Sequence, residues 1–244
     1  LCPSTVAWAE FLAKPGHKFV YAAYAILLAM FFDAIDGRLA RFTRHTTDFG
    51  GQLDSLADMI SFGAAPAFIA MQLFKSETAG HLPSLVGRLV WAAGALYMSC
   101  AAIRLARFNV SNKHGEQHHF SFLGLPSPGA AAAVVSLILL QQALAESGVA
   151  RVQSLAGMAV WALPAVLLSG GFLMVSTIRY PHLVNKYLRG RKSVPMLAVV
   201  VGLILAVVMA FEYTLAIGAL GYAFSGPLSW LWRLRRKGES PSAP

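Results

Sequence analysis

Seven long segments of this 244-residue chain contain no Asp, Glu, Lys or Arg, and this feature restricts the possible folds most strongly. A helix of about 20 apolar residues crosses the hydrocarbon core of a bilayer. Only 13% of the residues are charged, about half of the share that is usual in soluble domains. We therefore predict an all-α, polytopic membrane protein with seven complete transmembrane helices. The segments cover residues 19–32, 59–74, 89–103, 120–145, 152–178, 193–211 and 213–232.

The chain ends add to this organisation. Residues 1–13 are similar to the end of an eighth helix. We expect this helix to be truncated, because the chain begins with Leu rather than Met. The length predicts one membrane domain over residues 1–244, with a basic cytoplasmic tail from about residue 233. Two cysteines, Cys2 and Cys100, provide no disulfide framework.

The chain is basic, with 20 Lys and Arg against 11 Asp and Glu and a net charge of +9. Such an excess can indicate nucleic acid, anionic lipid or cytoplasmic loops. No soluble basic domain is present, so we expect no nucleic-acid partner. Most basic residues fall on one side of the membrane when the loop after the first complete span is cytoplasmic. We expect a multi-pass protein of a bacterial inner (cytoplasmic) membrane, with membrane lipids around it.

Four aspartates lie at the ends of two expected helices, on that same cytoplasmic side. Asp33 and Asp36 are three residues apart and Asp54 and Asp58 are four apart, so each pair shares a helix face. They could be solvated helix ends or partners of nearby arginines, but ionisable groups beside a membrane span are usually functional. Adjacent carboxylates need a positive charge to remain ionised. Hard oxygen ligands suit Mg²⁺, Mn²⁺ or Ca²⁺.

Small residues and an arginine accompany the aspartates. Gly37, Ala40 and Gly50 permit close approach of a ligand to the backbone. Arg41 is a permanent positive charge that suits phosphate. The combination of acids, small residues and arginine predicts a site for a metal-bound diphosphate at the cytoplasmic side.

The complete pattern resembles the signature of the CDP-alcohol phosphatidyltransferase family at every fixed position. It reads Asp33-x2-Asp36-Gly37-x2-Ala40-Arg41-x8-Gly50-x3-Asp54-x3-Asp58. The resemblance implies a helical membrane enzyme, usually a homodimer, that transfers a phosphatidyl or related group from a CDP-linked donor to an alcohol and releases CMP.

The resemblance also implies roles for the residues of the pattern. Asp33, Asp36 and Asp54 would bind two divalent cations, Mg²⁺ or Mn²⁺. Asp58 would share a metal or act as the general base toward the acceptor hydroxyl. The residues that would surround the cytidine and the diphosphate are Gly37, Ala40, Arg41 and Gly50.

Other segments resemble family members that use CDP-diacylglycerol as donor and L-serine as acceptor. They are LDSLADMISFGAAPA (53–67), RLARFNV (104–110), FLGLPSPGAAA (122–132) and YAFSGPLSW (222–230). The resemblance therefore implies phosphatidylserine and CMP as products. Serine carries a carboxylate, for which Arg104 and Arg107 are candidate partners, with Asn109 as a polar neighbour. The two arginines could equally be topology-determining charges at a helix end.

Two alternatives remain open from the sequence. The same chemistry could use another acceptor, such as glycerol 3-phosphate. A cation-coupled membrane transporter also accommodates intramembrane acids, although the internal repeats and paired broken helices of many transporters are not apparent. An idle structural member of the family is a third possibility, which the four intact aspartates disfavour.

Overall fold

The computed structural model describes residues 17–43, 48–78, 83–113, 124–178 and 210–238. These residues form helices and no strand, which confirms the all-α prediction for the described part of the chain. The helices are α2 (His17–Thr43), α3 (Asp48–Asp58), the π-helix η1 (Met59–Ala64), α4 (Ala65–Thr78), α5 (Ser84–Lys113), α6 (Ser127–Ala145), α7 (Ala150–Val175) and α10 (Phe211–Gly238).

In the part of the chain that the structure describes, five helical stretches are long and apolar enough to cross a membrane, so the chain is a multi-pass membrane protein. The predicted number of seven complete spans is not confirmed. Residues 193–209 of the expected span 193–211 lie outside the described residues, and the expected span 213–232 falls in α10, which is not one of these five stretches. The five stretches are His17–Asp36, Phe49–Thr78, Leu85–Val110, Ser127–Ala145 and Ala150–Val175.

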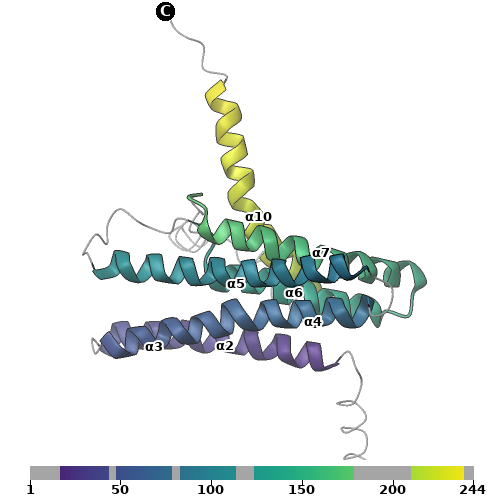
Figure 1. Cartoon of the computed structure of the whole chain (residues 1–244), viewed down its shortest axis with the longest axis horizontal. Coiled ribbons are helices and arrows are strands. Elements are labelled where there is room, and N and C mark those ends of the chain that lie inside the picture. The colour runs from purple at the N-terminus through teal and green to yellow at the C-terminus, as the bar shows by residue number, and fades with distance from the viewer. Residues whose placement is uncertain (1–16, 44–47, 79–82, 114–123, 179–209, 239–244) are drawn as a thin grey trace, which may run out of the picture.

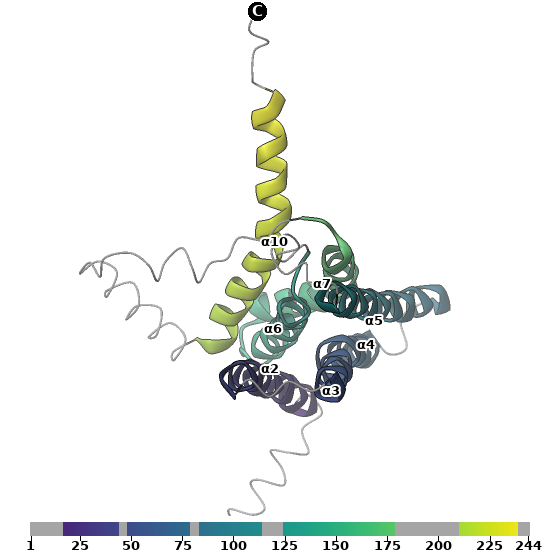
Figure 2. The same cartoon turned by 90° about the vertical axis from the view of Figure 1, so that its left-hand side faces the viewer.

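Helix α6 forms the centre of the bundle and packs against α2, α4, α7 and α10 (Figure 2). The sequence explains this position, because α6 is apolar on all sides, as is typical of an enclosed helix. It begins at Ser127 rather than at residue 120, after Pro126 and with Pro128 in its first turn. Proline suits this place because the first helical N–H groups have no partner within the helix.

Helix α10 changes direction along its length. Its first part packs along α6, and its C-terminal part points away from the bundle (Figures 1 and 2). Pro227 lies within this helix. A proline in a helix interior removes a hydrogen bond and clashes with the preceding turn, so it is the expected cause of a bend.

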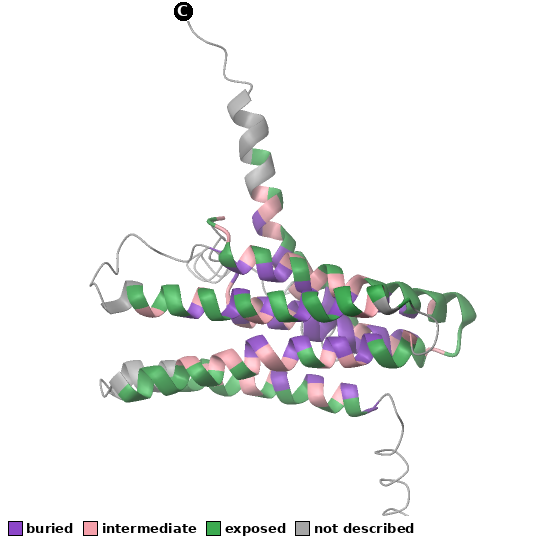
Figure 3. Cartoon of the chain, in the orientation of Figure 1, coloured by how far each residue is buried: buried purple, intermediate pink, exposed green. Residues whose placement is uncertain are grey.

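The bundle is densely packed at one end and open at the other (Figure 3). On α2, Phe19, Ala23 and Ile26 are buried, at the spacing of one helix face. Further along the same helix, Phe31 and Phe32 are 60% and 53% exposed. The C-terminal part of α2, together with α3, therefore extends beyond the packed core.

A π-helical segment separates α3 from α4. Pro66 has no N–H to donate to the carbonyl of Phe62, four residues earlier. The buried Tyr97 hydroxyl of α5 donates to that carbonyl instead, at 3.0 Å. Gly63 permits the close contact, because a Cβ atom there would lie 3.2 Å from the Cβ of Ala101. Such π segments often occur at functional sites, and η1 begins directly after Asp58.

Gly124 joins the start of α6 to the end of α7, and we predict that its replacement by Ala destabilises the bundle. Its N–H donates to the Ile178 carbonyl at 2.9 Å, and its φ is +84°. An added Cβ would lie 2.5 Å from the carbonyl oxygen of Met174. Gly148 also has a positive φ, of +65°, but no atom within 4 Å of such a Cβ.

Gly148→Ala is therefore the matched control. It is expected to cost about 1–2 kcal/mol from backbone strain alone, and Gly124→Ala is expected to cost more. Thermal unfolding midpoints of the detergent-solubilised proteins test this difference. Equal midpoints for the two variants would show that the contact at Gly124 relaxes without cost.

Candidate active site

The four predicted aspartates come from two neighbouring helices at the open end of the bundle. Asp33 and Asp36 lie on α2, and Asp54 and Asp58 lie on α3 (Figure 1). The carboxyl groups of Asp33 and Asp58 are in hydrogen-bonding contact, and each also interacts electrostatically with Asp54. Asp36 interacts with Asp33. The structure thus brings together the pairs that are about 20 residues apart in the sequence.

The chemistry of these donors fits a divalent cation. Oxygen ligands of negative charge suit Mg²⁺ and Mn²⁺, and the mutual repulsion of the carboxylates is relieved by a cation. Within the described ranges, no three Asp, Glu, His or Cys side chains converge closely enough to enclose one ion. The assignment of Asp33, Asp36, Asp54 and Asp58 as metal ligands therefore stays a prediction.

Arg104 of α5 lies within electrostatic reach of the acidic group. It interacts electrostatically with Asp58 and with Tyr222 of α10. One guanidinium nitrogen, Nη1, donates to the hydroxyl of Ser127 at 3.0 Å. Its Nε is buried and has no hydrogen-bond partner in the described part of the chain. A buried donor without a partner is costly, so this nitrogen is available to a bound anion.

The two other candidates for the acceptor site differ from Arg104. Arg107 is exposed. Asn109 is half-buried and its Nδ2 donates to the Ser55 hydroxyl of α3 at 3.0 Å. Asn109 therefore connects α5 to the helix of Asp54 and Asp58. Of the two arginines, the structure favours Arg104 as the residue that points into the site.

The residues expected around the donor lie on the same two helices. Gly37, Ala40 and Arg41 belong to the last turns of α2, and their side chains lie outside the described part of the structure. Gly50 lies in the first turn of α3 and is exposed. Their predicted contacts with cytidine and diphosphate are not tested by this geometry.

Ser127 and Tyr222 were not predicted as site residues. Both lie in segments that carry the family resemblance, FLGLPSPGAAA and YAFSGPLSW. Ser127 stands between Pro126 and Pro128, and prolines favour the first turn of a helix, so the sequence indicated a helix start at Ser127. No feature of the sequence indicated that Ser127 lies close to Arg104, because α5 and α6 meet only through the tertiary fold.

Comparison with known proteins identifies similar sequences. The profile of the CDP-alcohol phosphatidyltransferase family matches residues 1–168. The chain is 36% identical over 167 residues to a CDP-diacylglycerol–serine O-phosphatidyltransferase of Helicobacter pylori, covering 68% of this chain and 63% of the relative. The enzyme of that name from Methanocaldococcus jannaschii is 33% identical over 161 residues, covering 66% and 64%.

A eukaryotic protein is similar over a shorter region. The Saccharomyces cerevisiae enzyme of the same printed name is 37% identical over 131 residues, which cover 51% of this chain and 43% of the relative. The chain thus spans less than two thirds of the length of these curated relatives.

Proposed function

Because the chain belongs to the CDP-alcohol phosphatidyltransferase family, we propose that it transfers the phosphatidyl group of CDP-diacylglycerol to L-serine and releases CMP. The names of the similar proteins support this choice of donor and acceptor. The observation that carries the proposal is the meeting of the acidic group of α2 and α3 with a half-buried Arg104. The acidic group is suited to a metal-bound diphosphate, and Arg104 is suited to a carboxylate.

Asp33, Asp36, Asp54 and Asp58 would hold divalent cations, two Mg²⁺ or Mn²⁺ ions in our proposal. When bound, such ions neutralise charge on the diphosphate and stabilise the attacking and leaving oxygens. The protein contributes mainly position and charge in phosphoryl transfer. The two helices that carry these aspartates supply both, because they hold the four carboxylates at one end of the bundle.

Asp58 is the proposed general base. It is half-buried, lies where α3 meets the π-helix, and interacts electrostatically with Arg104. The serine hydroxyl gives its proton to Asp58 as its oxygen bonds to the phosphorus that carries diacylglycerol. The bond from that phosphorus to the bridging oxygen of the diphosphate breaks, and this oxygen leaves with CMP.

Arg104 is the proposed partner of the serine carboxylate. Its unpaired Nε and its fixed charge suit a carboxylate. Ser127 holds the other edge of the guanidinium group. An acceptor bound there would have its hydroxyl on the side of Asp58, because Arg104 and Asp58 are close enough to interact electrostatically. The proposed donor-binding residues are Gly37, Ala40, Arg41 and Gly50.

The wider setting is part of the same proposal. Residues 1–244 act as one membrane domain of a homodimer in the cytoplasmic membrane, with the acidic end at the cytoplasmic side. This orientation is supported by the basic residues that lie on that side. Residues 193–211 and 213–232 supply the remaining two of seven complete spans.

We expect CMP release by the purified protein to require both serine and a divalent metal. The substrate is CDP-diacylglycerol in mixed micelles, with L-serine, glycerol 3-phosphate or myo-inositol phosphate offered separately. Removal of Mg²⁺ and Mn²⁺ by a chelator is expected to lower the rate by at least about 100-fold, because metal stabilisation of the transition state is worth several kcal/mol.

The three acceptors and the chelator show which part of the proposal fails if the expected result is not obtained. Metal-dependent release with glycerol 3-phosphate but not with serine would keep the family chemistry and overturn the acceptor. Absence of release with all three acceptors would overturn the enzymatic function. Release that survives the chelator would contradict the role of the aspartates as metal ligands.

A further inference from the structure

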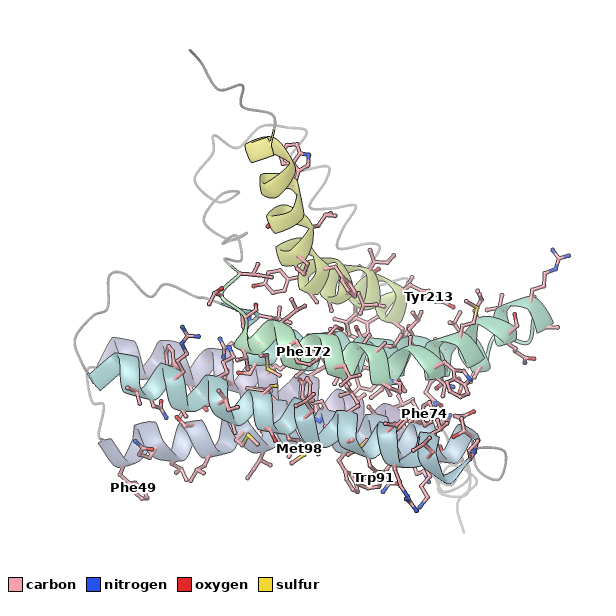
Figure 4. The ribbon with its side chains drawn as sticks, turned by 45° about the horizontal axis from the view of Figure 1, so that its top comes forward. Phe49, Phe74, Trp91, Met98, Phe172 and Tyr213 are labelled. Atoms are coloured by element: carbon pink, nitrogen blue, oxygen red, sulfur yellow. The ribbon has the colours of Figure 1, made fainter. Side chains whose placement is uncertain are left out.

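A cavity of about 490 Å³ lies between α2 and α4, at the end of the bundle opposite to the acidic residues. Lys18 lines it, and this residue is about 22 Å along α2 from Asp33, at 1.5 Å per residue. Figure 4 shows the two ends of the α3–α4 run, with Phe49 at the acidic end and Phe74 next to the cavity residue Lys75. The cavity is therefore separate from the proposed active site and belongs to the other membrane leaflet.

The lining of the cavity changes from polar to apolar along both helices. Lys18 on α2 and Lys75 and Ser76 on α4 lie at the helix ends. Ala22 and Phe68 lie one to two turns closer to the membrane centre. The polar part thus lies toward the interface and the apolar part toward the hydrocarbon. This is the orientation of a single phospholipid in that leaflet.

The charge of the polar part suits an anion. Lys18 and Lys75 are exposed and form no ion pair within the described residues. The Lys18 ammonium lies 5.1 Å from the centre of the Phe19 ring, in cation–π contact. The nearby Glu146 is paired with His17, with 3.2 Å between its Oε1 and the Nε2 of His17. Glu77 is not among the residues that line the cavity. Two lysines on adjacent helices above an apolar cavity favour a phosphate group with an attached acyl chain.

We propose that this cavity binds one anionic phospholipid. Its phosphate lies between Lys18 and Lys75, and an acyl chain fills the space beside Ala22 and Phe68. The lipid connects the N-terminal end of α2 to the C-terminal end of α4. It is a bound lipid of the outer leaflet and takes no part in the proposed reaction, which lies at the opposite membrane face.

Native mass spectrometry of the full chain in a neutral detergent tests the proposal, with dioleoyl-phosphatidylglycerol or dioleoyl-phosphatidylcholine as the added lipid. We expect one phosphatidylglycerol to be retained in preference to phosphatidylcholine. The double variant Lys18→Gln/Lys75→Gln is expected to bind it about thirtyfold more weakly, since each lysine near a lipid surface contributes about fivefold. Ala22→Phe fills the apolar part without changing the charge and is expected to abolish retention.

The matched control is Arg88→Gln/Arg151→Gln, which removes two exposed basic residues outside the cavity. It is expected to retain phosphatidylglycerol as the unaltered protein does. Equal losses in the two double variants would show non-specific attraction and overturn the proposal. Retention of phosphatidylcholine to the same extent, or retention of phosphatidylglycerol by Ala22→Phe, would also overturn it. A thermal shift with inorganic phosphate that equals the shift with phosphatidylglycerol would identify an anion site without a lipid.

Discussion

Asp58→Asn is expected to lower the rate of CMP release by about 10²–10⁴-fold, the range that a general base contributes. Asparagine has nearly the same size but cannot accept the proton of the serine hydroxyl. Asp58 is half-buried, is in hydrogen-bonding contact with Asp33 and interacts electrostatically with Arg104. Steady-state CMP release at saturating CDP-diacylglycerol and serine measures the effect.

The metal dependence of this variant separates the two roles proposed for Asp58. If the residue acts as base, the rate stays low at saturating Mn²⁺. If it acts mainly as a metal ligand, added Mn²⁺ restores much of the rate. Glu77→Gln, an exposed residue at the other end of α4, is the control and is expected to change the rate by less than about twofold. A rate for Asp58→Asn within about threefold of the unaltered protein would remove both roles.

Arg104→Gln is expected to raise the KM for serine by about 10–100-fold and to change the KM for CDP-diacylglycerol much less. A hydrogen bond to a charged group contributes about 1.5–3 kcal/mol, and each 1.4 kcal/mol is tenfold in affinity. The buried Nε of Arg104 has no partner among the described residues, and its Nη1 is held by Ser127. Initial rates over a range of serine concentrations provide both constants.

Arg107→Gln provides the comparison, because Arg107 is three residues further along α5 and exposed. Its effect on the KM for serine is expected to be clearly smaller. Arg104→Lys retains the charge but not the planar, forked donor group, so an intermediate KM is expected. A thermal unfolding midpoint for each variant separates loss of binding from loss of folding. Equal effects of Arg104→Gln and Arg107→Gln on the KM for serine would show that these charges act only by setting the membrane topology.

The sequence allowed the prediction of the helical membrane class and of the acidic site. Long uncharged segments in a bilayer must satisfy their backbone hydrogen bonds internally, as a helix does. Five of the expected spans accordingly agree with the helices. The spacing of Asp33, Asp36, Asp54 and Asp58 is a local property of helices, and it placed each pair on a shared face before any contact was known. The family resemblance lies in these same residues.

The limits of the helices were less predictable. The segment 120–145 contains no charge, but its helix begins only at Ser127, because Gly124 adopts a left-handed conformation and Pro126 precedes the first turn. The segment 213–232 is also uncharged, although its helix bends away from the bundle. Hydropathy counts apolar residues, but it does not specify the direction of a chain that contains Gly124, Pro126 or Pro227.

The sequence by itself determined which residues are apolar, which carboxylates share a helix face and which charges lie near a membrane surface. Only the tertiary structure distinguished Arg104 from Arg107, brought Ser127 and Tyr222 to the same guanidinium group, and joined Lys18 to Lys75 around one cavity. The reason is physical. Helix periodicity acts over three or four residues, whereas these contacts join helices far apart in the chain, and their geometry depends on how the helices pack around α6.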